Sequence, residues 1–145
     1  MTPAPPPRTA RGVFVLYALA LVTATHWPGL AIASPSGLRL DLLIHAGAFG
    51  TWLLLLCLCR FFGPILSPRN LVRCALLSGA YALLDELTQG IPILRRTIDP
   101  WDLGANLSGI ALAAGALVLV ARAARKSVGS TLTSPGTGPK PSESA

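Results

Sequence analysis

The sequence predicts an all-α integral membrane protein, a bundle of four transmembrane helices joined by short loops. Two observations lead to this fold class: the composition is 52% hydrophobic and only 12% charged, and long apolar runs recur along the chain. Soluble domains carry about 25% charged residues, so this chain of 145 residues has too few charges to cover a globular core. The composition excludes a soluble enzyme and a disordered protein.

The net charge of +6 does not indicate a nucleic-acid partner. Basic surfaces that bind phosphate gather their cations into a patch or stripe, whereas the 12 Lys and Arg residues of this chain are scattered between apolar runs. The predicted partner is therefore the lipid bilayer.

Four segments have the length of about 20 mostly apolar residues that a spanning helix requires. They cover residues 12–33, 42–62, 70–89 and 101–121. Uninterrupted runs of this length exceed the strands of about ten residues in a membrane barrel. Only the first segment is interrupted, at His26-Trp27-Pro28, and we assign His26 to the interfacial aromatic belt.

The ends of the predicted helices carry boundary signals. Ser67 and Asp99 each precede a proline, so each places a capping side chain before a proline at the first helical position. Asp99 is accordingly interpreted as the N-cap of the fourth helix. Gly90, followed by Pro92, predicts that the third helix ends in a left-handed cap.

One membrane domain, residues 11–126, is expected between two disordered tails. Residues 1–10 are rich in proline, and residues 127–145 are mostly Ser, Thr, Gly and Pro; neither buries enough apolar area to offset its ordering entropy. An alternative for residues 1–33 is a signal peptide, since the small residues 31–33 resemble a cleavage site. Cleavage would leave the other three helices in the same orientation.

The charges predict how the bundle is oriented. Nine of the 12 cations fall on one side of the predicted topology, which should be cytoplasmic, and both termini lie on that side. Arg39, Arg95 and Arg96 fall on the outer side. Five of the six acids share this outer side: Asp41, Asp85, Glu86, Asp99 and Asp102.

Polar residues are paired at three of the outer helix ends. Residues four apart share a helix face, and the pairs are Asp41 with His45, Asp85 with Gln89, and Asp102 with Asn106. Ionisable groups at membrane depth are costly and normally face the bundle interior or a wet cavity. We therefore expect these faces to meet in one cleft that opens outward.

Structural interpretations compete with a site role at some of these positions. Asp41 and Asp102 are close enough to helix starts to act as capping acids. Glu86 lies about 100° from Asp85 around the helix and is either a site residue or directed to the headgroups. Ala105, Gly109 and Ala113 have the small-xxx-small spacing that allows helices to approach closely.

The motifs of this layer resemble those of the VanZ-like family of membrane proteins. Residues 85–89 match its DExxQ motif, and Asp41-x3-His45 resembles its motif at the start of the second helix. Arg96, Asp102, Asn106 and Gly109 follow its R-x5-D-x3-N-x2-G spacing. The resemblance covers about residues 25–115 and implies a role at the outer face of the bacterial cytoplasmic membrane, linked to teicoplanin resistance.

Two functions fit these residues. In the first, an enzyme acts on an envelope lipid or cell-wall precursor, with His45 and Asp85 as acid–base groups, Asp41 fixing the His45 tautomer and Arg96 binding an anionic headgroup. In the second, the polar layer binds an envelope component or a partner, or stabilises the bundle, without catalysis. The candidate site residues are Asp41, His45, Asp85, Glu86, Gln89, Arg96, Asp102 and Asn106.

No cofactor is predicted. A divalent metal held by His45 with the carboxylates is one interpretation of the ligand set, and a hydrogen-bonded network without metal is the other. The oligomeric state is not predicted from these residues.

Overall fold

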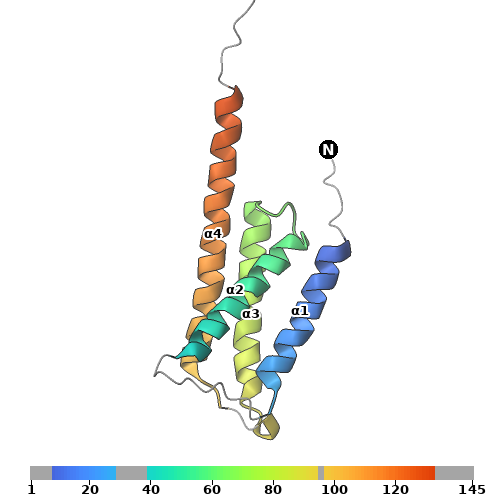
Figure 1. Cartoon of the computed structure of the whole chain (residues 1–145), viewed down its shortest axis with the longest axis vertical. Helices are drawn as coiled ribbons and strands as arrows, with labels where there is room; N and C mark the ends of the chain where they lie inside the picture. The colour runs from blue at the N-terminus through green and yellow to red at the C-terminus, as the bar shows by residue number, and fades with distance from the viewer. Residues whose placement is uncertain (1–7, 29–38, 95–96, 133–145) are drawn as a thin grey trace, which may run out of the picture.

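The computed structural model describes residues 8–28, 39–94 and 97–132, and this part of the chain is helical apart from its turns (Figure 1). The elements are α1 (Arg8–His26), α2 (Leu40–Leu58), α3 (Pro68–Gln89), the short 3-10 helix η1 (Pro92–Leu94) and α4 (Pro100–Leu132). The all-α prediction is confirmed for these residues. Among them, α1, α2 and residues 100–127 of α4 are long and apolar enough to cross a membrane.

The helices run alternately up and down, and the two ends of the bundle differ in charge. The start of α1, the turn between α2 and α3, and the end of α4 lie at one end (Figure 1), which we call the basic end. Its described cations are Arg8, Arg11, Arg60, Arg69, Arg73, Arg122, Arg125 and Lys126. The opposite end, the acidic end, carries Asp41, Asp85, Glu86, Asp99 and Asp102.

The helix boundaries differ from the predicted ones. The second helix ends at Leu58 rather than at residue 62, because Arg60 adopts a positive φ of 56°. The fourth continues to Leu132, past residue 121 and into the predicted tail. The Arg, Ala and Lys residues at positions 122–126 favour helix, and the helix extends six residues beyond them. The first spans Arg8–His26; residues 29–33, predicted to belong to it, and residues 133–145 lie outside the described part.

The predicted N-caps are confirmed, and the predicted left-handed cap is wrong. Ser67 accepts a hydrogen bond from the Asn70 amide at 3.3 Å, and Asp99 accepts one from the Trp101 amide at 2.8 Å. Gly90 instead has a right-handed φ of −69°. A Cβ atom at this position would lie 2.8 Å from the Ile98 side chain, so Gly90 packs closely against the α3–α4 connection.

Aromatic rings from three helices form the centre of the bundle. Tyr81 of α3 stacks on Trp52 of α2 with ring centroids 4.2 Å apart and on Phe49 at 5.8 Å. Phe14 of α1 contacts the Trp52 ring edge to face at 4.9 Å. These rings lie in the same apolar core as Leu53, Leu56 and Ile110.

The outer surface of the bundle is apolar on every helix. Large exposed side chains include Leu16 of α1, Leu43 of α2, Leu76 of α3 and Leu112 of α4. Scattered apolar residues are normal on soluble proteins, but exposure of this extent marks a surface that meets another apolar phase. A lipid bilayer is the environment that this surface indicates.

α2 and α4 pack closely at Gly109. A Cβ atom built there would overlap the carbonyl oxygen of Ala46 and lie 2.6 Å from its carbonyl carbon. On the facing helix, a Cβ atom at Gly50 would lie 3.1 Å from the Gly109 oxygen. The predicted role of Gly109 in close helix approach is confirmed, and the approach brings the polar residues one turn away into contact.

Replacing Gly109 should separate these helices. We expect Gly109→Ala to lower the free energy of unfolding by about 1–3 kcal/mol, because the added methyl group overpacks the contact. Unfolding in detergent can be followed with a thiol-reactive dye, since Cys57, Cys59 and Cys74 are buried and unpaired.

Gly115→Ala is the matched control, because a Cβ atom at Gly115 has no neighbour within 4 Å. It should be neutral or stabilising by up to about 1 kcal/mol, since alanine favours helix more than glycine does. Equal stability of the two variants would contradict the close packing at Gly109.

Candidate functional site

The predicted polar layer is present at the acidic end, but its residues form two hydrogen-bond networks. The first, which we call the Asp85 network, joins α1 to α3 and consists of Thr25, His26, Tyr81, Asp85, Thr88 and Gln89. The second, the His45 network, joins the start of α2 to the start of α4 and consists of Arg39, Asp41, His45, Asp99, Asp102 and Asn106.

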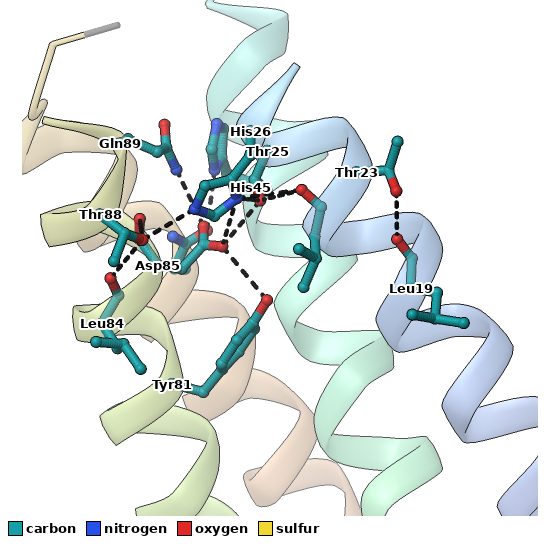
Figure 2. Close-up of polar contacts among 12 residues, drawn as sticks. Leu19, Thr23, Thr25, His26, His45, Tyr81, Leu84, Asp85, Thr88 and Gln89 are labelled. Carbon is teal, nitrogen blue, oxygen red and sulfur yellow. Dashed lines mark hydrogen bonds and ion pairs between the residues drawn. The ribbon is translucent and has the colours of Figure 1, made fainter. Parts of the chain in front are cut away.

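Asp85 is the centre of the first network and is almost completely buried. Its carboxylate accepts hydrogen bonds from Thr25 at 2.8 Å, Gln89 at 3.0 Å and Tyr81 at 3.3 Å, and Figure 2 shows these side chains around it. The predicted pairing of Asp85 with Gln89 is confirmed. Three donors compensate a carboxylate for the loss of water, so this network is well satisfied.

His26 belongs to the same network, although the sequence placed it at the membrane interface. Its Nε2 lies 2.9 Å from the Thr88 hydroxyl, and its Nδ1 lies 2.9 Å from the Thr25 hydroxyl and 3.7 Å from Asp85 Oδ1 (Figure 2). Sequence reasoning missed Thr25, His26, Tyr81 and Thr88. For Thr25, His26 and Thr88 the available signal was their depth, because each lies near the end of a helix at the acidic end.

His45 is the centre of the second network. Its Nδ1 lies 3.0 Å from Asn106 Oδ1, and its Nε2 lies 3.5 Å from Asp102 Oδ2. Asp102 and Asn106 thus share one face of α4, as their spacing predicts. The expectation that Asp41 orients the imidazole is wrong: both ring nitrogens face α4, and the Asp41 carboxylate lies 3.0 Å from Arg39 instead.

Arg39 connects the acids at the rim of this network. Its Nη2 lies 3.0 Å from Asp41, 3.2 Å from Asp99 and 3.9 Å from Asp102. The hydrogen bond to Asp41 raises the pKa of Arg39 above its usual value, so the guanidinium stays charged. Its side chain is 46% exposed, and water and salt therefore weaken these pairs.

Glu86 lies between the two networks and is 1% exposed, so the alternative that it points to the headgroups is wrong. Its Oε1 accepts a hydrogen bond from the Asp99 backbone amide. In a capping box the acid three residues after the N-cap accepts this bond. Because Glu86 accepts it here, Asp102 is free to face His45, and Glu86 is close enough to interact electrostatically with Asp102, His45 and Asp85.

Most of the buried polar atoms without a hydrogen-bond partner lie in the His45 network or on the neighbouring Glu86. In the described part of the chain they are Glu86 Oε2, Asp102 Oδ1, Asn106 Nδ2 and, in the aromatic core, Trp52 Nε1. Leaving such a group unpaired costs about 1–3 kcal/mol. The carboxylate of the Asp85 network is therefore fully paired, whereas the His45 network and Glu86 keep buried polar atoms that make no hydrogen bond.

Arg96 and the metal interpretation are the two remaining predictions for this end of the bundle. Arg96 lies outside the described residues, so its predicted place above the acids stays a prediction. Within residues 8–28, 39–94 and 97–132, no group of three or more His, Cys, Asp or Glu side chains is arranged to hold a metal ion.

Comparison of the chain with models of known protein families, with curated proteins and with solved structures finds no match. The resemblance to VanZ-like proteins therefore depends on the motif residues alone. The geometry of the two networks carries the functional interpretation.

The Asp85 network predicts which of two neighbouring threonines stabilises the protein. Thr25→Val removes a donor from a buried carboxylate and should lower the free energy of unfolding by about 1–2 kcal/mol, measured by thermal unfolding in detergent. Thr23→Val is the matched control on the same helix, because the Thr23 hydroxyl is exposed and bonds only the Leu19 carbonyl. Equal losses in both variants would rule out the predicted role of Thr25.

Proposed function

We propose that the protein is a multi-pass protein of the bacterial cytoplasmic membrane that binds a cell-envelope component at its acidic end, in the manner implied by its resemblance to VanZ-like proteins. One observation carries the proposal: three buried polar atoms without a hydrogen-bond partner lie in the His45 network and on the neighbouring Glu86, next to partly exposed acids. A bound headgroup or cell-wall precursor would supply the missing partners.

The proposal includes four membrane spans, with α3 as the fourth. Five of the polar residues that reduce the hydropathy of α3 are directed inward: Asn70, Ser78, Asp85, Glu86 and Gln89 are all buried. Its two arginines, Arg69 and Arg73, are exposed at the basic end. Its outer face carries exposed Val72, Leu76, Leu83, Leu84 and Leu87. A helix whose polar groups pair inside the bundle can present an apolar surface to lipid, which supports a spanning role.

The same geometry is suited to acid–base chemistry. Asn106 and Asp102 fix the orientation of the His45 ring, as a carboxylate commonly does for an imidazole that transfers a proton. We propose binding before catalysis, because buried polar atoms without a hydrogen-bond partner favour a bound group. Modification of the bound component would be a further step at the same residues.

A second function, stabilising the bundle without ligand, is favoured for the Asp85 network. Its carboxylate has three donors and almost no exposure, so a ligand would have little to bind. The two functions that the sequence left open are thus assigned to different residues.

The proposed orientation places the acidic end outside the cell. In intact cells, a membrane-impermeant maleimide should label Thr97→Cys, which is exposed in the α3–α4 connection, and should label Lys126→Cys only after permeabilisation. The natural cysteines are buried, which keeps the background low. Labelling of Lys126→Cys but not of Thr97→Cys in intact cells would contradict the proposal and indicate the opposite orientation.

Loss of the His45–Asp102 contact should remove the function without unfolding the bundle. We expect Asp102→Asn and His45→Gln to reproduce the deletion phenotype in envelope lipid and precursor profiles and in teicoplanin susceptibility, at unchanged protein level. Ser108→Ala is the control, since this exposed hydroxyl on α4 bonds only the Gly104 carbonyl. Normal profiles and susceptibility in both site variants, compared with an altered deletion strain, would contradict the proposed site.

A further inference from the structure

The unpartnered atoms at the His45 network define what a ligand must offer. Glu86 Oε2 and Asp102 Oδ1 are carboxylate oxygens, which accept hydrogen bonds, and Asn106 Nδ2 is a donor. Asp102 Oδ1 makes no hydrogen bond, but it lies 3.9 Å from Arg39 Nη2. Glu86 and Asn106 are at most 1% exposed, so water from the surface does not satisfy them freely. A ligand that offers donors to the two carboxylate oxygens and an acceptor to the Asn106 amide would complement these atoms.

The charges at the acidic end indicate whether the ligand's donor is charged or neutral. Four carboxylates, those of Asp41, Glu86, Asp99 and Asp102, face one guanidinium and one imidazole among the described residues. The guanidinium of Arg39 is shared by three of these acids and is not paired with Glu86. A buried carboxylate without a cation is costly, so a cationic donor fits better than a neutral one.

We propose that the site binds a primary ammonium group that lies next to an oxygen acceptor. The ammonium has three N–H donors and no acceptor, so it matches the two carboxylate oxygens of Glu86 and Asp102 in charge and in hydrogen-bonding role. The Asn106 amide donates to the neighbouring oxygen, a phosphate or a hydroxyl group. The inference rests on the proposed function and names the ligand class of that site; the ammonium can belong to a lipid headgroup or to a soluble amine.

Three lipids and one free amine distinguish these sources. The purified full chain is titrated in detergent with phosphatidylethanolamine, phosphatidylcholine or phosphatidylglycerol, and bound lipid is counted by native mass spectrometry. Phosphatidylcholine keeps the phosphate and the positive charge but has no N–H donor. Free ethanolamine, added in the absence of lipid, tests a soluble source by its effect on thermal unfolding.

We expect phosphatidylethanolamine to bind at least about tenfold more tightly than phosphatidylcholine, which corresponds to one hydrogen bond to a charged group. Glu86→Gln and Asp102→Asn should each reduce this preference, and Ser108→Ala should keep it. Stabilisation by ethanolamine that depends on Glu86, without lipid selectivity, would support the ammonium class with a soluble source.

Equal binding of phosphatidylethanolamine and phosphatidylcholine, with no effect of ethanolamine, would overturn the inference. So would tightest binding of phosphatidylglycerol, which indicates an anionic ligand. Neither result would affect the proposed function, which fails separately if Asp102→Asn and His45→Gln leave the envelope profile normal.

Discussion

A carboxylate cannot be buried between apolar helices unless donors replace its water, and Asp85 obtains its donors from two helices. Thr25 reaches it from α1, and Tyr81 and Gln89 reach it from the preceding and following turns of α3. Tyr81 also stacks on Trp52 in the core. The hydrogen bonds that Asp85 accepts therefore hold α1 against α3. Through Tyr81, they also connect the polar end of the bundle to its apolar centre.

The second network depends on backbone proximity. Gly109 allows α4 to contact the backbone of Ala46, the residue next to His45, and this contact brings the imidazole to Asp102 and Asn106. Because the helix start at Asp99 is capped through Glu86, Asp102 is not used as a cap. The close approach at Gly109 brings polar side chains of α2 and α4 together. Because Glu86 takes the capping role that Asp102 would otherwise have, Asp102 faces His45, and some polar atoms there make no hydrogen bond.

The sequence predicts local features well, because they depend on spacing along one helix. The N-cap at Asp99 and the close approach at Gly109 are both confirmed. Pairing between helices depends on how each helix is rotated, which spacing does not specify, and so the partner of His45 was assigned to the wrong helix. Thr25 and His26 were missed because their depth near the helix end does not identify a partner, and the partner of a hydroxyl or an imidazole is known only once the facing residue is known.

The separation of the polar layer into two networks is tested most directly by double-mutant cycles on unfolding free energy. Thr25→Val and Asp85→Asn should be coupled by about 0.5–1.5 kcal/mol, as directly bonded groups in membrane proteins are. Thr25→Val and Asp102→Asn should be additive to within about 0.5 kcal/mol. Coupling of similar size in both cycles would contradict the separation and indicate one continuous network.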